Sequence, residues 1–369
     1  MAANIVLAAA ALKRAAGVII AKGGSAPHEA DLVAGNLVET NLRGHDSHGV
    51  GMIPRYVDSL LDGELQPNQQ PEVKLDTGVL LRLDGRRGYG QAIGVAAMAL
   101  GIERARKHGV CVIALANSHH LGRIGCWAEQ CISAGLASVH FANVIARPVV
   151  APWGGRDARL GTNPICIGIP RPGRDPIVLD MATSRIAQGK TRVAFNRGEE
   201  LESGVLLDDH GDPTTNPRFA VKPPFGALLP FGEHKGYGLS VACELLGGAL
   251  TGGGTGRVPY QGKRRVLNGM FSILIDPEHL GTGAEFARET EEFVEWVLRS
   301  PPASDDNRVK LAGDPEREYR KQRLAEGIPV DAATWEEILA AGEKLGVERA
   351  EVTELAGIAR HHSVTTSPT

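Results

Sequence analysis

Residues 110–144 have the sequence VCVIALANSHHLGRIGCWAEQCISAGLASVHFANV, and this stretch decides the predicted fold. It opens with a strand-like apolar run over 110–115. A helical pattern follows over 124–134 and ends at Gly135, a typical C-cap residue. The alternating run over 137–144 is typical of a second strand. A strand, a helix and a strand in about 35 residues match a βαβ crossover, and a mixed sheet with helices on one face fits equally well.

The pattern continues on both sides of this stretch. Residues 91–107 are rich in helix formers and stop at Gly109. Short strands are expected at 166–169 and 177–179. These elements together predict a central α/β region over residues 76–232.

The two ends of the chain are predicted to be mainly helical. Helical segments are expected at 1–22, 25–44, 283–299 and 332–345, with a helical pattern from Gly236 onward and a polar loop over 300–315. We therefore predict an α/β fold of the α+β mixed-sheet kind in two domains. One is a helical domain built from residues 1–75 and 233–369, and the other is the central α/β domain over 76–232.

Composition narrows the class of protein. The chain has 369 residues, a formal net charge of −3 and 43% hydrophobic residues, values that exclude a disordered tail, a collagen and a coiled coil. Lys and Arg are dispersed, so a nucleic-acid partner is not expected. No apolar run reaches the roughly 18 residues of a membrane helix. Five cysteines without a C-x-x-C pair argue against a disulfide framework and indicate a cytoplasmic protein. The 46 glycines suggest many close backbone approaches, and those beside the polar loop residues are interpreted as ligand-facing turns.

A secretory signal is weighed against a helix at the N-terminus. Residues 5–12 form an apolar run, but Lys13 and Arg14 follow it, whereas a signal peptide carries its basic residues before such a run. The helix is the favoured interpretation.

Several well-known catalytic motifs do not occur in the sequence. It contains no phosphate-binding P-loop, no H-E-x-x-H zinc motif, no G-x-S-x-G elbow and no kinase set. Gly88 and Gly90 followed by Gly94 fall one residue off the dinucleotide fingerprint G-x-G-x-x-G, so tight-turn glycines are the better interpretation. His45, Asp46 and His48, or the His119–His120 pair, lack an evident third ligand, and no metal site is predicted.

Three groups of polar residues interrupt apolar surroundings. The first is GHDSHG at 44–49, where a His in a glycine-flanked loop could reach a substrate or could bond only to turn backbone. The second is NSHHLGR at 117–123, placed between a strand and a helix, where anions bind or a helix is simply capped. The third combines 150–164, 180–184 and 230–236, of which the last could hold a cofactor phosphate or be a solvated loop.

These segments resemble the type 2 malate/L-lactate dehydrogenase family. The resemblance rests on DSHG at 46–49, NSHHLG at 117–122, VAPWGG at 150–155, GTNP at 161–164, LDMATS at 179–184, LLPFGEHKGYG at 228–238 and GDPE at 313–316. It implies interconversion of a 2-oxo acid and a 2-hydroxy acid with NADH or NADPH, in a homodimer whose active site lies between domains. It also implies a non-Rossmann dinucleotide-binding fold, in which the central domain binds NAD(P).

The resemblance also implies roles for individual residues. His48 matches the proton donor to the substrate carbonyl, Ser47 its orienting partner, and His120 the other catalytic His. Cofactor contacts fall on His48, Gly122, Arg123, Ile124, Val178, Leu179, Asp180, Met181, Ala182, His234, Lys235, Asn268, Gly313, Asp314, Pro315 and Glu316. Thr162 and Thr183 fall on the substrate side. An imidazolium near the developing alkoxide would stabilise its charge and then donate a proton.

One departure from the family pattern concerns the substrate carboxylate. Many members carry Arg four residues after the DSHG histidine, but this chain has Met52 there. A thioether cannot replace a guanidinium fork, so Arg55 or Arg123 is expected to hold the carboxylate. Met52 would form an adaptable apolar wall that favours a bulky or aromatic 2-oxo acid such as a phenylpyruvate.

Two alternatives to this function remain open. The first is reduction of a cyclic imino acid, which some relatives perform with an acidic relay residue where this chain has Lys190. The second is a catalytically inactive relative that only binds the dinucleotide. The presence of His48, His120, Asp180 and His234 argues against the second alternative.

Overall fold

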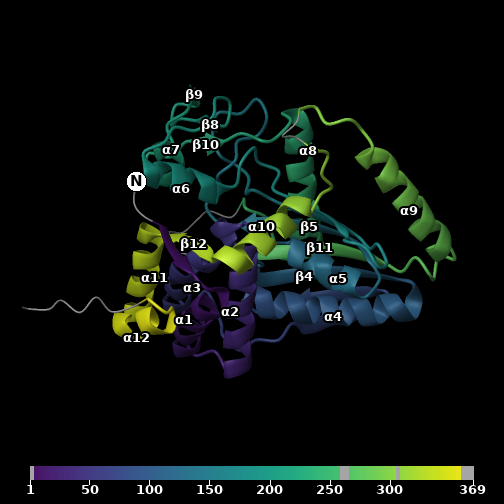
Figure 1. Ribbon diagram of the computed structural model, residues 1–369, viewed down its shortest axis with the longest axis horizontal. Coiled ribbons are helices and arrows are strands. Elements are labelled where there is room, and N and C mark those ends of the chain that lie inside the picture. The colour runs from purple at the N-terminus through teal and green to yellow at the C-terminus, as the bar shows by residue number, and fades with distance from the viewer. Residues whose placement is uncertain (1–3, 258–265, 305–307, 359–369) are drawn as a thin grey trace, which may run out of the picture.

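A seven-stranded mixed sheet forms the centre of the molecule. The computed structural model describes residues 4–257, 266–304 and 308–358 (Figure 1). The strands, in spatial order, are β2 (Glu72–Asp76), β3 (Leu80–Asp84), β4 (Val110–His119), β11 (Leu267–Ile275), β5 (Ala137–Ile145), β6 (Ile165–Ile169) and β7 (Ile177–Met181). Only β3 and β4 pair in parallel, and every other neighbouring pair is antiparallel. The predicted α/β class with a mixed sheet is confirmed.

The predicted strand–helix–strand unit exists, but its two strands are not neighbours. β11 lies between β4 and β5 and pairs antiparallel with both. The prediction of a helical pattern from Gly236 onward was therefore wrong for residues 267–275. β11 is buried on both faces along its first half, so its apolar run lacks the alternation that marks a half-buried strand.

Helices cover both faces of the sheet. Figure 1 shows α4 (Gly90–His108) and α5 (Gly125–Ser133) below it and α8 (His234–Cys243) above it. α8 continues into a π-helix over Glu244–Leu250, which packs on β5 and β11. The α4–α5 layer and the sheet enclose one apolar core that contains Trp127, Met98 and Ile113.

A second core lies among helices from both chain ends. Its helices are α1 (Ala9–Lys22), α2 (Pro27–Leu42), α3 (Ile53–Leu61), α11 (Ala332–Lys344) and α12 (Arg349–Leu355). β1 (Asn4–Leu7) pairs with β12 (Ile328–Asp331), which joins the two ends. The helix predicted over 1–22 thus begins only at Ala9, after a four-residue strand too short to show a periodic pattern.

The remaining elements lie around these two cores. They are β8 (Leu206–Leu207), β9 (Pro213–Thr214) and β10 (Ala227–Leu228) in one small sheet, α6 (Gln188–Arg197), α7 (Arg218–Val221), α9 (Gly283–Leu298) and α10 (Asp314–Glu326). The division into domains at 76–232 stays a prediction, although β11 joins its sheet from outside that range.

Glycines permit the closest contacts between helices and sheet. A Cβ at Gly90 would collide with the carbonyl of His120, and a Cβ at Gly269 would collide with the carbonyl of Gly247. A Cβ at Gly94 would stand 2.5 Å from the indole ring of Trp127, which is 1% exposed. The shifted glycine fingerprint around Gly90 therefore has a packing role.

The contact at Gly94 predicts a loss of stability on Gly94→Ala. The fully buried indole has no space to retreat, so we expect a decrease of about 1–3 kcal/mol in the free energy of unfolding. Urea denaturation would measure this decrease. Gly238→Ala is the matched control, because no atom lies within 4 Å of its Cβ position in α8. The control should leave stability unchanged or raise it by about 0.5–1 kcal/mol, and equal behaviour of the two variants would contradict the packing role.

Candidate active site

Two histidine rings from distant segments stack at the junction of the two cores. The ring centroids of His48 and His120 lie 5.5 Å apart at an interplanar angle of 23°. His48 ends the short 3-10 turn Asp46–His48, and His120 follows β4 directly. The structure thus brings together the first and second of the predicted polar segments.

The turn that carries His48 is anchored by polar side chains. The Asn41 side chain accepts a hydrogen bond from the Val50 N–H (2.8 Å) and donates one to Asp46 (2.7 Å). Arg323 of α10 binds both carboxylate oxygens of Asp46, at 2.6 and 3.0 Å. A Cβ at Gly49 would overlap the Asn41 amide, so a glycine at this position is what allows Asn41 to anchor the turn.

Each ring of the pair uses Nδ1 for a bond within the protein. His48 Nδ1 lies 2.9 Å from the hydroxyl of Ser47, the residue predicted to orient it. His120 Nδ1 lies 2.8 Å from the Tyr56 hydroxyl, which accepts a hydrogen bond from Gln91 Nε2 at 2.8 Å. The Tyr56 oxygen accepts from Gln91, and when the Tyr56 O–H donates to His120 Nδ1 the ring proton of His120 lies on Nε2. Among the described residues, neither Nε2 has a hydrogen-bond partner.

Burial keeps these rings neutral. Burial, and after it the neighbouring His45, lowers the pKa of His48 to about 4. The pKa of His120 lies well below its ordinary value, first through burial and then through His48, His119 and Arg55. Burial also lowers the pKa of His119 to about 3. His119 is fully buried beside the Tyr56 ring and both of its nitrogens lack partners, so it is a core residue and differs in this from His120.

A second polar cluster lies at the N-terminus of α5. Asp180, near the end of β7, accepts a hydrogen bond from the Gly125 N–H at 2.7 Å. Burial raises the pKa of Asp180, while Arg123, His45 and this N–H act in the opposite direction. A Cβ at Gly125 would overlap Arg123 and stand 2.9 Å from Asp180, so the two charged groups share one corner. Gly122, before that helix, has a left-handed φ of +71°.

The segment before α10 joins this cluster. The Val178 N–H donates to the Ala312 carbonyl at 3.1 Å, and His45 Nε2 lies 3.2 Å from Glu316. Gly313, with φ of +96°, turns the chain into α10. The Asp314 side chain accepts from the Leu311 N–H and from Arg317. Pro315 is exposed in the first turn. The predicted cofactor segments at 122–124, 178–182 and 313–316 are thus neighbours in space.

Asn268, predicted as a cofactor contact, uses its side chain for hydrogen bonds to the backbone of the protein. Its side-chain oxygen accepts from the Leu121 N–H at 2.8 Å, and its amide donates to the Asn143 carbonyl at 2.7 Å. β11 thereby holds the loop after β4, on which His120 lies.

The two threonines assigned to the substrate side belong to one turn. Thr183 is fully buried, and its hydroxyl donates to the carbonyls of Thr162 and Asn163 at 3.0 Å each. The Thr183 hydroxyl is therefore engaged by backbone, while Thr162 is half-buried.

The loop before α8 reaches the same region. The Phe231 N–H donates to the Thr183 carbonyl at 3.1 Å. His234 is exposed at the start of α8, with its ring 5.6 Å from that of Trp153. Lys235 is exposed next to it.

The expected carboxylate anchors occupy different environments. Arg123 is 3% exposed and binds Glu129 at 2.5 Å. Arg55 is exposed on α3, and Met52 packs partly against the helical core. Arg192 of α6, which sequence patterns did not single out, has its Nη2 3.3 Å from the Cβ position of Gly51, next to Met52. The neighbouring Gly189 allows α6 to touch Ser47, because a Cβ there would overlap it.

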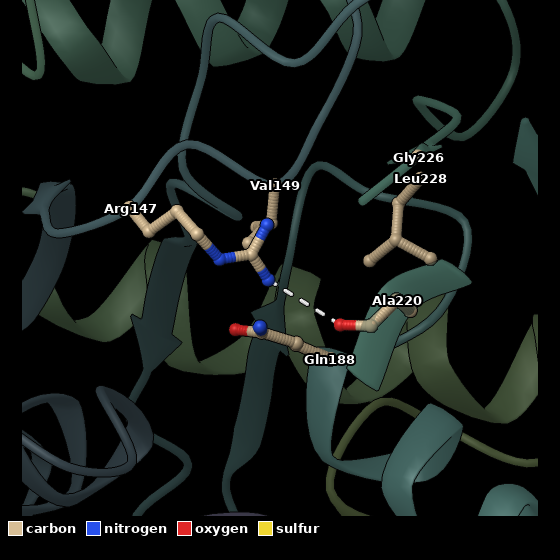
Figure 2. Close-up of a pocket in the computed structure, with 6 residues that line it drawn as sticks. All are labelled: Arg147, Val149, Gln188, Ala220, Gly226 and Leu228. Atoms are coloured by element: carbon tan, nitrogen blue, oxygen red, sulfur yellow. Dashed lines mark hydrogen bonds between the residues drawn. The ribbon is translucent and has the colours of Figure 1, made fainter. Parts of the chain in front are cut away.

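A narrow pocket is lined by Gln188, the first residue of α6, together with Arg147, Ala220 and Leu228. Figure 2 shows the Arg147 guanidinium within it, donating to the Ala220 carbonyl at 3.3 Å above Gln188. Arg147 also stacks on the Phe225 ring at 3.8 Å. The Arg147 guanidinium is thus engaged by protein groups within the pocket lining.

The described parts of the chain contain neither a cluster of metal ligands nor a helix that could span a membrane. No group of three or more His, Cys, Asp or Glu residues among them could hold a metal ion. No helix among them is both long enough and apolar enough to cross a membrane.

Comparison with known proteins places these residues in a family. The Malate/L-lactate dehydrogenase family profile matches residues 7–339. Hydroxycarboxylate dehydrogenase B of Escherichia coli O157:H7 is 48% identical over 326 residues, which cover 88% of this chain and 90% of the relative. The Delta(1)-pyrroline-2-carboxylate/Delta(1)-piperideine-2-carboxylate reductase of Pseudomonas syringae pv. tomato is 35% identical, covering 85% and 90%.

A solved structure gives the same result at the level of the fold. Sulfolactate dehydrogenase from Methanocaldococcus jannaschii superposes with a TM-score of 0.83 at 30% identity, covering 94% of this chain and 99% of that one. The non-Rossmann architecture expected from the sequence is therefore that of a family in which several members are named as hydroxy-acid dehydrogenases. The chain belongs to the malate/L-lactate dehydrogenase family.

Proposed function

We propose that the protein reduces a 2-oxo carboxylic acid to the 2-hydroxy acid with NADH or NADPH. The observation that carries this proposal is the stacked pair of His48 and His120. Each ring has its Nδ1 engaged by a hydroxyl, and its Nε2 has no hydrogen-bond partner among the residues that the structure describes. Two such nitrogens side by side suit a carbonyl oxygen that gains negative charge and then a proton.

The cofactor segments fit a dinucleotide. Segments 122–124, 178–182 and 313–316 converge, and positive φ values at Gly122 and Gly313 allow the backbone to approach a ligand closely. The buried Nε of Arg123 lacks a partner within the described structure and could serve an anionic group. His234 and Lys235, exposed nearby, are further proposed contacts, as is Asn268 through the loop that it holds. A bound NAD(P)H would supply the hydride.

His48 is proposed as the proton donor and Ser47 as the group that orients it. The ring is neutral in the free protein because burial lowers its pKa, so it can accept the proton of a 2-hydroxy acid directly. In the reductive direction it must first gain a proton, which the developing charge on the substrate oxygen favours. His120, oriented by Tyr56, would hold the same oxygen through Nε2.

The substrate is proposed to be a bulky or aromatic 2-oxo acid. Met52 supplies an adaptable apolar wall, and Thr162 lies on the turn that Thr183 holds. Arg192 lies beside residue 51 and is the candidate for the carboxylate, ahead of the exposed Arg55 and the engaged Arg123. Its ion pair with Glu337 is 3.3 Å long and partly exposed, so it is weak enough to be exchanged for a substrate carboxylate.

Cyclic imino acid reduction is the second candidate function, because one relative in the family bears that name. Lys190, at the position where some imino-acid-reducing relatives are expected to carry an acidic relay residue, is exposed in α6 and cationic. The homodimer and the cytoplasmic location stay predictions.

The first test replaces the proposed proton donor. His48→Asn should lower kcat by about 10²- to 10⁴-fold, since general acid catalysis is lost, while dinucleotide binding is largely kept. Steady-state kinetics and fluorescence titration would measure the two effects. His28→Asn, at an exposed position on α2, is the control and should behave like wild type. If kcat barely changes in His48→Asn and collapses in His120→Asn, then His120 is the donor.

The second test uses pH. The folded-state pKa of His48, about 4, lies below the ordinary 6.5, so the neutral form predominates above pH 5. In the oxidative direction kcat/KM should stay flat from pH 8 to pH 5 and fall only as pH approaches 4. In the reductive direction kcat/KM should rise about tenfold for each unit that pH falls over the same range. A reductive profile that is flat between pH 5 and pH 8 would rule out His48 as the acid.

The third test addresses the substrate. Phenylpyruvate should give a higher kcat/KM than oxaloacetate, because Met52 leaves an apolar wall where a second carboxylate would need a cation. Arg192→Met should raise KM for both acids by about tenfold or more, whereas Glu337→Gln should not raise it. A clear preference for oxaloacetate, or an unchanged KM in Arg192→Met, would refute the corresponding part of the proposal.

A further inference from the structure

A basic pocket lies between α5, α10 and the end of α2. Its volume is about 490 Å³. It is lined by Arg43, Glu129, Ile132, Ser133, Asp175, Pro176, Arg317, Arg320, Lys321 and Leu324. Four of these side chains are cationic and two are anionic, so the lining carries an excess of positive charge.

The cations of this pocket are incompletely neutralised. Arg43 and Arg320 share one carboxylate oxygen of Glu39, at 2.9 and 2.7 Å. Within the described chain, no carboxylate lies within 4 Å of the Lys321 ammonium. Arg43 also binds Glu129 at 3.0 Å, and Arg317 binds Asp314 and lies 3.8 Å from Asp175. The positive charge available to a bound anion is therefore that of Arg320, which among the described residues has only its share of Glu39, and of Lys321.

The pocket continues the proposed dinucleotide groove. Glu129 binds Arg43 at 3.0 Å and Arg123 at 2.5 Å, which connects the pocket to segment 122–124. Arg317 follows Glu316 in α10 and donates to the Pro176 carbonyl at 3.0 Å, two residues before Val178. Three parts of its lining, in α5, in α10 and at 175–176, are therefore close in sequence to the three cofactor segments.

The anionic side chains of the pocket bear on the choice of cofactor. An acidic residue that binds the ribose 2′-hydroxyl would favour NADH, and a basic residue there would favour NADPH. Glu129 is engaged by two arginines and cannot serve as a free acceptor. The Asp175 side chain is 76% exposed. The groups that remain available are Arg320 and Lys321.

We propose that this pocket binds the 2′-phosphate of NADPH, a phosphate monoester dianion, and gives the enzyme a preference for NADPH over NADH. This inference rests on the proposed function. Arg320 and Lys321 are the residues that contact the phosphate, and Arg43 completes the positive field.

Binding measurements test the proposal without turnover. Fluorescence titration should give a Kd for NADPH about tenfold or more below that for NADH in the wild-type protein. Arg320→Gln and Lys321→Gln should each raise the Kd for NADPH by about tenfold or more and change that for NADH by no more than about twofold. Lys321→Gln removes no ion pair within the described parts of the fold, so it remains informative if Arg320→Gln is unstable. Arg288→Gln in α9, outside the pocket, is the matched charge control and should change neither Kd.

Competition identifies the source of the phosphate. 2′-AMP should displace NADPH from wild type and do so less well from Lys321→Gln, while 5′-AMP should not discriminate between the two proteins. Equal Kd values for NADPH and NADH in wild type would overturn the proposal, as would an equal loss of both in the variants. Binding of inorganic phosphate that leaves NADPH affinity unchanged would assign the pocket to a free anion instead. Absence of turnover with any 2-oxo acid would refute the proposed function, whereas turnover with NADH and NADPH alike would refute only this inference.

Discussion

The close approach of α4 to the backbone after β4 is the constraint on which the site depends. Gly90 lies against the carbonyl of His120, and no side chain could be accommodated between them. On the opposite side Asn268 holds the same loop through the Leu121 N–H. A backbone pinned from both sides gives the His120 ring one position, so that Tyr56 can meet its Nδ1 and His48 can stack on it.

Close contacts that leave no room for a Cβ also explain other glycines near the site. Gly49 and Gly125 were interpreted as ligand-facing turns, yet they face the Asn41 amide and the Arg123 guanidinium respectively. Gly189 likewise faces a protein group, the Ser47 side chain. Their lack of a Cβ lets polar side chains pack tightly beside the candidate catalytic residues. Gly122 and Gly313, with left-handed φ values, still fit the original interpretation.

Sequence patterns predicted the elements that carry local periodicity. α4, β4, α5 and β5 appear close to their expected bounds because apolar spacing and C-cap glycines mark them. β11 and the β1–β12 pair were missed, since one is buried on both faces and the others are four residues long. Such strands are defined by their partners and not by their own pattern.

The residues of the candidate site also fall into those that the sequence predicted and those that it did not. The motif segments around His48, His120 and Asp180 were found because they carry unusual residues together, and resemblance extended them to a cofactor groove. Tyr56, Gln91 and Arg192 carry no such local signal, because each gains its position from a helix that packs on the site. Three-dimensional contact alone could reveal them.

The position of β11 also bears on the order in which the chain can fold. This strand lies between β4 and β5, and the bond from Leu121 to Asn268 spans 147 residues of sequence. During synthesis, β4 and β5 must therefore wait with their inner edges unpaired until almost three quarters of the protein has been made. Closing so long a loop slows folding, and exposed strand edges invite association with other chains. The strand that completes the catalytic loop is thus also the piece that ends this vulnerable period.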